Sequence, residues 1–339
     1  MNSSQTSQSR SAQETTSANA TECNAEPQPI SWRKIVAKYQ QPSLAKSLWQ
    51  ITNTVLPYAG LWSLMYFTVN HSWPLTIALA VLAGLFLVRI FIIFHDCGHG
   101  SYFRSATANH VVGFICGLLT FTPYRHWRWQ HAVHHGSAGN LDQRGIGDVW
   151  TMTVNEYLAA PRWERFCYRL TRNPFVLFGL IPLGLFLVYQ RIPYASASKR
   201  DRSSVHRMNF SILALMIAMS AVFGFWNYLC IQLMVTAVSG SLGVWLFYVQ
   251  HQFEDTYWRN QTEWDYTSSA MQGSSFYHLP KILQWFSGKF LETQLTRLMV
   301  WCGLGAGEQD KLPLIWAKLQ ATKDKEDAKA VLTKHFERL

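Results

Sequence analysis

The chain has 339 residues, of which 49% are hydrophobic and only 15% are charged, whereas soluble domains average roughly 25% charged residues. Its apolar residues gather into blocks close to the ~20 residues that a helix needs to cross a bilayer, which excludes a soluble globular protein and favours an all-α integral membrane protein. The formal net charge of +10 does not indicate nucleic-acid binding, because the Lys and Arg residues flank the apolar blocks.

Residues 1–45 precede the first apolar block and are predicted to be a disordered polar tail with a basic flank. Residues 1–30 are rich in Ser, Thr, Gln, Asn and Ala and are nearly free of large apolar side chains. Such a segment cannot bury enough surface to fold. Residues 46–290 are expected to form the membrane domain, and residues 291–339 a divergent C-terminal tail.

Four transmembrane helices in two hairpins are predicted from the longest apolar blocks. The first hairpin joins Ile51–Val69 to Pro74–Phe94, and the second joins Asn209–Trp226 to Tyr228–Gln250. Basic residues precede the first block, so the positive-inside rule places the N-terminus in the cytoplasm. These basic residues are Arg33, Lys34, Lys38 and Lys46.

Two shorter apolar blocks, Val111–Phe121 and Phe175–Tyr189, fall short of a comfortable span. The histidine-rich segment before the second block and the basic segment after it both belong on the cytoplasmic side. A block that begins and ends on one side does not cross, so we expect these blocks to be re-entrant or interfacial. Residues 95–208 and 251–339 are then expected to form a cytoplasmic helical cap.

Seven of the twelve histidines lie between residues 95 and 135, although an even spread would place only about 1.5 of them there. His95 and His99 are four residues apart at the end of the second block, so a helix would place them on one face. Interfacial histidines without chemistry would explain one such cluster more easily than two. The further histidines have the spacing i, i+3, i+4 or follow the last span directly: His131, His134, His135 and His251.

These ligand types favour a histidine-rich metal centre, expected to be binuclear, at the membrane face. Neutral imidazole suits zinc, copper, iron and nickel. The six cysteines form no C-x-x-C pair, which argues against thiolate sites and a disulfide framework. No H-E-x-x-H or E-x-x-H is present, so neither a zincin nor a carboxylate-bridged di-iron bundle is supported. Three carboxylates could orient the imidazoles or simply bind backbone amides or arginines: Asp96, Asp148 and Glu254.

The segments 95–101, HDCGHGS, and 125–150, RHWRWQHAVHHGSAGNLDQRGIGDVW, resemble the first two histidine boxes of the membrane fatty acid desaturases. The likeness is to the acyl-lipid omega-6 or delta-12-like branch, and it covers about residues 50–290. The segments 243–258 and 273–288 are similar to that family's approach to its third box. The resemblance implies an oxidoreductase in which two iron ions and O2 introduce a double bond into an acyl chain. It also implies a set of iron ligands: His95, His99, His131, His134, His135 and His251.

The third histidine box, of the H-x-x-H-H type, is missing. After residue 288 the chain continues as KFLETQLTRLMVWCGLGAGEQDKL, and no histidine lies between His278 and His335. Losing a ligand weakens a metal site, so the activity of this chain is left open. His278 is a candidate substitute ligand.

The resemblance further implies an acyl-lipid or acyl-CoA substrate, a surrounding of membrane lipids, and cytochrome b5 or ferredoxin as electron donor. The expected location is a membrane, that of the endoplasmic reticulum in a eukaryote or the plasma membrane in a bacterium. Three alternatives remain open at this point. They are an acyl hydroxylase, a non-catalytic lipid- or partner-binding protein derived from a desaturase, and a metal transporter.

Overall fold

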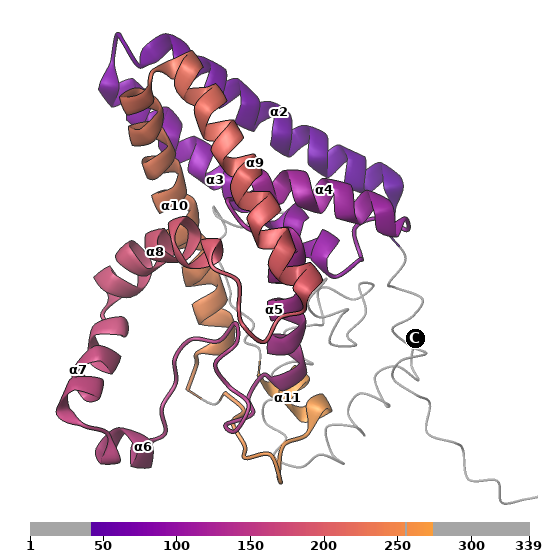
Figure 1. The fold of residues 1–339 in the computed structure, drawn as a ribbon, viewed down its shortest axis with the longest axis vertical. Helices are drawn as coiled ribbons and strands as arrows, with labels where there is room; N and C mark the ends of the chain where they lie inside the picture. The colour runs from indigo at the N-terminus through magenta and orange to yellow at the C-terminus, as the bar shows by residue number, and fades with distance from the viewer. Residues whose placement is uncertain (1–41, 255, 274–339) are drawn as a thin grey trace, which may run out of the picture.

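The computed structural model describes residues 42–254 and 256–273. Most of the predicted N-terminal tail, His278, the position of the missing third box and the C-terminal tail lie outside the described residues. Helices dominate the described part of the chain (Figure 1). In chain order they are α2 (Leu44–Thr68), α3 (Trp73–Gly98), α4 (Ala106–Leu119), α5 (Tyr124–Ser137), α6 (Val154–Ala159), α7 (Arg162–Thr171), η1 (Val176–Leu180), α8 (Ile181–Leu187), η2 (Tyr189–Arg191), α9 (Lys199–Phe223), α10 (Phe225–His251) and α11 (Tyr266–Gln272).

Helix α3 is the centre of the bundle, because α2, α4 and α10 all pack against it. Pro74 stands in its first turn, where a missing N–H costs nothing. Ile90, Ile93 and Phe94 are fully buried near its C-terminal end. The helix continues without a break from the predicted second span through His95 to Gly98, as the spacing of the first histidine pair requires.

Three helices in the described ranges are long and apolar enough to cross a membrane: α3, α9 and α10. A fourth candidate arises if α7 and residues 176–191, which are bent by 67° relative to each other, are counted as one broken span. The same bend also suits a re-entrant loop, the arrangement expected for Phe175–Tyr189. Helix α4, which contains most of the other short block, has only 14 residues. The cytoplasmic position of the predicted cap stays a prediction.

Helix α2 covers the first predicted span but is not among the three apolar helices. Its polar residues have partners inside the bundle. Arg89 of α3 donates hydrogen bonds to Asn53 Oδ1 at 2.7 Å and to Thr54 Oγ1 at 3.2 Å. An arginine inside an apolar helix needs such polar neighbours, so the residues that make α2 less apolar also stabilise α3.

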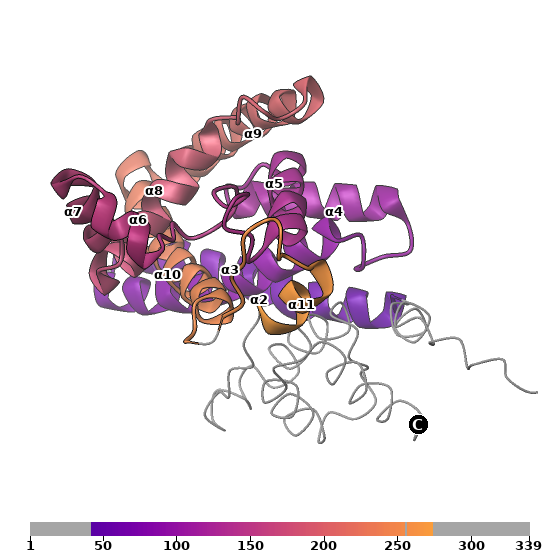
Figure 2. The same cartoon turned by 90° about the horizontal axis from the view of Figure 1, so that it is seen from below.

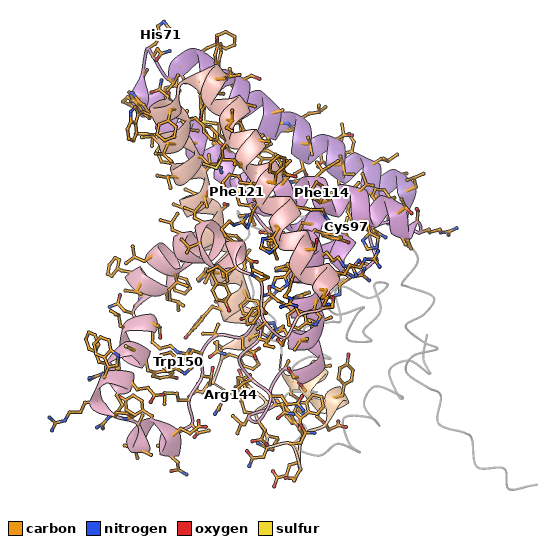
Figure 3. The ribbon with its side chains drawn as sticks, viewed as in Figure 1. His71, Cys97, Phe114, Phe121, Arg144 and Trp150 are labelled. Carbon is orange, nitrogen blue, oxygen red and sulfur yellow. The ribbon has the colours of Figure 1, made fainter. Side chains whose placement is uncertain are left out.

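The turn between α9 and α10 is a single residue, Gly224, with a φ of 80°. Glycine adopts this left-handed backbone without the steric cost that a Cβ brings. The sequence placed the break of this hairpin between Trp226 and Tyr228, slightly after the glycine that forms the turn. The other hairpin turn carries His71, which lies at the opposite end of the molecule from Arg144 and Trp150 (Figure 3).

Candidate metal centre

Four histidines from two helices direct their Nε2 atoms at one another. His95 lies in the last turn of α3 and His99 caps that helix, while His131 and His135 lie one turn apart on α5. Nε2 of His131 is 3.0 Å from Nε2 of each of the other three. The ligand atoms of all four lie within 4.8 Å of one another. We call this set the four-histidine group.

The four-histidine group depends on the close approach of α5 to the end of α3. A Cβ on Gly98 would lie 2.9 Å from Cζ3 of Trp127, so this position leaves no room for a side chain. The Tyr124 hydroxyl donates a hydrogen bond to the Cys97 carbonyl at 2.7 Å and ties the two helices together. The Trp127 ring stacks on His131, with centroids 4.4 Å apart and planes at 19°. Trp127 is one turn before His131, and that spacing is a signal the sequence analysis did not use.

The protonation state of the four-histidine group suits metal binding. Burial, reinforced by neighbouring His95, lowers the pKa of His99 to about 3. Burial also holds the pKa values of His131 and His135 well below 6.5, with the neighbouring imidazoles adding to the effect. These side chains are therefore neutral at pH 7, and neutral imidazole is the form that ligates metal.

His134 does not join this group, although it shares the i, i+3, i+4 spacing with His131 and His135 that would let a helix direct all three to one point. Its ring faces His251 at the end of α10, with centroids 5.0 Å apart. Nδ1 of His134 lies 2.5 Å from Asp148 Oδ1. Its Nε2 is buried and has no hydrogen-bond partner among the residues that the structure describes. A buried ring nitrogen without a partner, on a ring whose other nitrogen is held by a carboxylate, is the arrangement expected of a histidine that binds a metal ion.

A small cavity of about 20 Å³ lies beside this second pair, lined in part by His134, Asp148 and His251. That volume accommodates one water molecule or a single ion. Nδ1 of His251 is 3.0 Å from the Gly273 carbonyl oxygen, which leaves its Nε2 available. We call His134 and His251 the two-histidine pair.

The three carboxylates singled out in the sequence differ in their surroundings. Asp148 contacts His134 as described and also accepts a hydrogen bond from the Gly145 amide at 3.1 Å. Asp96 is buried, and its Oδ1 lies 3.3 Å from Nδ1 of His95. Glu254 is exposed and makes no hydrogen bond or ion pair to a histidine of the described ranges. The structure thus brings two of the three to a candidate ligand.

Arg172, at the C-terminal end of α7, connects the loop of Asp148 to the end of α10. Its guanidinium donates to the Trp150 carbonyl at 2.7 Å and to Gln252 Oε1 at 3.0 Å. Gln252 directly follows His251, and Trp150 is two residues from Asp148. Arg172 could not be identified from the sequence, since its partners are 22 and 80 residues away and no local pattern links them.

The remaining histidines of the described ranges lie apart from both sets. His126 is fully buried, and its Nε2 accepts a hydrogen bond from the Tyr194 amide at 3.3 Å. His110 and His206 are exposed. His71 is in the hairpin turn at the other end of the molecule (Figure 3). These positions are typical of packing or surface residues.

Comparison with known proteins gives a consistent result. The sequence matches the fatty acid desaturase family over residues 70–291. A fatty acid desaturase of Bacillus subtilis (strain 168) is 48% identical over 255 residues, covering 75% of this chain and 72% of that protein. An sn-1 oleoyl-lipid 12-desaturase of Synechocystis sp. is 24% identical over 229 residues, covering 66% of this chain and 62% of that protein.

An sn-1 acyl-lipid omega-3 desaturase (ferredoxin), also from Synechocystis sp., is 29% identical over 146 residues. This alignment covers 42% of the chain and 39% of the relative. The aligned segments therefore span less than two thirds of both cyanobacterial relatives. The family match spans both histidine boxes, and the chain belongs to the fatty acid desaturase family.

Proposed function

We propose that the protein is a multi-pass membrane oxidoreductase that introduces a double bond into a fatty acyl chain, with O2 as co-substrate. The observation that carries this proposal is the convergence of four Nε2 atoms within 4.8 Å of one another, at the end of a candidate span. Family membership supplies the reaction class. Location in a plasma membrane is consistent with the Bacillus relative.

The donor set fits iron at two positions. The four-histidine group would hold one ion, and the two-histidine pair would contribute to a second. Imidazole suits iron, and these nitrogens are buried. Iron bound there supplies the activation of O2 that removal of hydrogen from an unactivated methylene requires.

The protein's own groups prepare the ligands for this role. Asp148 accepts a hydrogen bond from Nδ1–H of His134, which favours the tautomer with a lone pair on Nε2. The Gly273 carbonyl does the same for His251. The ring of Phe247 lies 5.3 Å from that of His134 and 4.9 Å from that of His251, so an apolar side chain shields this pair from water.

The two positions are unequal, because the four-histidine group supplies twice as many nitrogens as the two-histidine pair. In the family, the third box would add ligands, and its pattern does not occur after residue 288. We propose that the second ion is the weaker one, with His278 as the nearest histidine in sequence beyond the described residues. Glu254 stays a less favoured candidate for orienting a ligand.

An acyl lipid is the proposed substrate, since cyanobacterial relatives are named for acyl-lipid and oleoyl-lipid desaturation. Three of the relatives are named with ferredoxin, so we propose a ferredoxin-type electron donor. Acyl-CoA and cytochrome b5 are the alternatives. Supplying ferredoxin or cytochrome b5, each with an acyl lipid or with acyl-CoA, to the purified protein in lipid nanodiscs would distinguish these alternatives.

The test is iron content together with lipid analysis of a host that lacks the activity. The wild-type protein should carry two iron ions per chain and yield lipids that have lost two hydrogens. H131Q should lose the iron of the four-histidine group, whereas the exposed His206→Gln control should not. A product that gains oxygen would indicate a hydroxylase instead. Protein without iron and without product would contradict the proposal and favour a non-catalytic role.

A further inference from the structure

Helix α7 exposes a face that is both apolar and basic. Trp163, Phe166 and Leu170 expose 72%, 46% and 44% of their surface, and their spacing places them on one stripe of the helix. The Trp163 and Phe166 rings stack with centroids 5.5 Å apart. Arginines with the same spacing form the adjoining stripe: Arg162, Arg165 and Arg169. We call these six residues the α7 face.

The opposite side of α7 packs against the rest of the described structure, so the α7 face points away from it. The Tyr168 ring packs edge-on against Trp150, with centroids 5.4 Å apart. Arg172, the C-cap of the helix, binds Gln252 as described above. Figures 1 and 2 show α6 and α7 at the edge of the molecule opposite α4.

Exposed apolar side chains also follow α7 in the chain, on a segment that lies along a candidate span. Phe175 is 87% exposed and Leu180 is 67% exposed. The segment that contains them packs on α10, where the Ser241 hydroxyl donates a hydrogen bond to the Phe178 carbonyl. The end of α7 is therefore where exposed apolar surface meets the side of the bundle.

We propose that α7 lies in the headgroup layer of the membrane and binds anionic lipids. In this position Trp163, Phe166 and Leu170 enter the boundary of the acyl chains, while the arginines contact lipid phosphates. Neither bulk water nor the hydrocarbon core is a favourable environment for both the apolar and the basic side chains of the α7 face. Water would leave three large apolar side chains exposed, and the hydrocarbon core would strand three arginines. The inference does not depend on catalysis or on iron.

Hydrogen exchange of α7 in the full chain, measured by mass spectrometry in nanodiscs, tests the proposal. One set of nanodiscs contains phosphatidylcholine alone, and the other also contains phosphatidylglycerol. Backbone amides of α7 should exchange several-fold more slowly in the anionic nanodiscs. Each arginine near an anionic surface strengthens binding by about fivefold, so R162Q/R169Q should remove most of the difference.

The matched control is R104Q/R259Q, which removes the same charge from two other exposed positions and should keep the lipid difference. W163S/F166S should speed exchange of α7 in both kinds of nanodisc. Exchange of α3 serves as the folding check for every variant. Equal exchange of α7 in the two lipids, or an equal effect of the control, would overturn the proposal. Such a result would indicate that water or a protein partner covers the α7 face.

Discussion

Oδ1 of Asp148 lies 2.5 Å from Nδ1 of His134, and the other ring nitrogen of this histidine is buried without a hydrogen-bond partner in the described ranges. The loop that ends at Asp148 turns back over α5, and Gly147, with a φ of 78°, fits closely against it. A Cβ at this glycine would be 3.1 Å from Cβ of His134. One carboxylate therefore determines both the tautomer and the direction of a candidate ligand.

Replacing Asp148 by Asn should weaken metal binding at the two-histidine pair. The neutral amide no longer favours a proton on Nδ1 of His134, and loss of such an orienting partner typically costs about 10–100-fold in metal affinity or activity. Iron content after dialysis against a graded chelator series measures the change. Glu254→Gln is the matched control, since that carboxylate is exposed. If E254Q lost iron and D148N did not, the two carboxylates would have been assigned the wrong way round.

Much of the site could be predicted from the local sequence, because helical spacing alone pairs His95 with His99 and His131 with His135. The separation of His134 could not be predicted in this way. His134 lies between His131 and His135 in the sequence of α5, but its side chain points away from theirs. Which residue it contacts depends on where α10 packs. The same holds for Arg172, whose role depends on contacts between distant parts of the chain.

The helices of the fold could likewise be predicted from local sequence only in part. Apolar block length correctly indicated α3, α9 and α10. For α2, composition alone did not reveal that Asn53 and Thr54 serve Arg89. These polar positions make sense only once the two helices are packed together.

Replacing Gly98 by Ala should disturb the four-histidine group through Trp127. The new Cβ would be 2.9 Å from the indole ring, so the ring or the helix must move, at a cost of about 1–3 kcal/mol. Because the same ring stacks on His131, iron retention should fall together with the thermal midpoint. Gly136→Ala provides the comparison within α5, since no atom of the described part of the chain lies within 4 Å of its Cβ position.

The expected effect of G136A is neutral or slightly stabilising, by at most about 1 kcal/mol. Differential scanning fluorimetry in detergent reports the midpoints of both variants. Equal midpoints for G98A and G136A would contradict the tight contact between α3 and α5.

Acidification should destabilise the metal-free protein. His99 has a pKa of about 3 in the folded state, and the pKa values of His131 and His135 are also well below the ordinary 6.5. Below pH 6.5 the unfolded chain therefore binds more protons than the folded one, so stability is highest at neutral pH and falls as the pH drops towards 3. Each buried histidine contributes up to about 1.4 kcal/mol per pH unit in this window.

Thermal midpoints of the chelated protein between pH 7.5 and pH 5, as a practical part of that window, measure the slope. H131Q/H135Q should flatten it, whereas His206→Gln, an exposed position on α9, should leave it unchanged. A midpoint that does not vary with pH would mean that the imidazoles are not buried as neutral groups.

Replacing Arg172 by Gln should loosen the two-histidine pair while sparing the four-histidine group. The guanidinium joins the Trp150 carbonyl to Gln252, and a shorter neutral side chain cannot span both. Iron content should therefore fall towards half of the wild-type value, with the remaining iron held at the four-histidine group. Lys should rescue only in part, because an ammonium lacks the planar fork that reaches several acceptors at once. Absorption of the cobalt-substituted protein would show which position is lost, and R259Q, at an exposed arginine, serves as the control. Equal loss of metal from both positions would mean that Arg172 supports the whole fold rather than this pair.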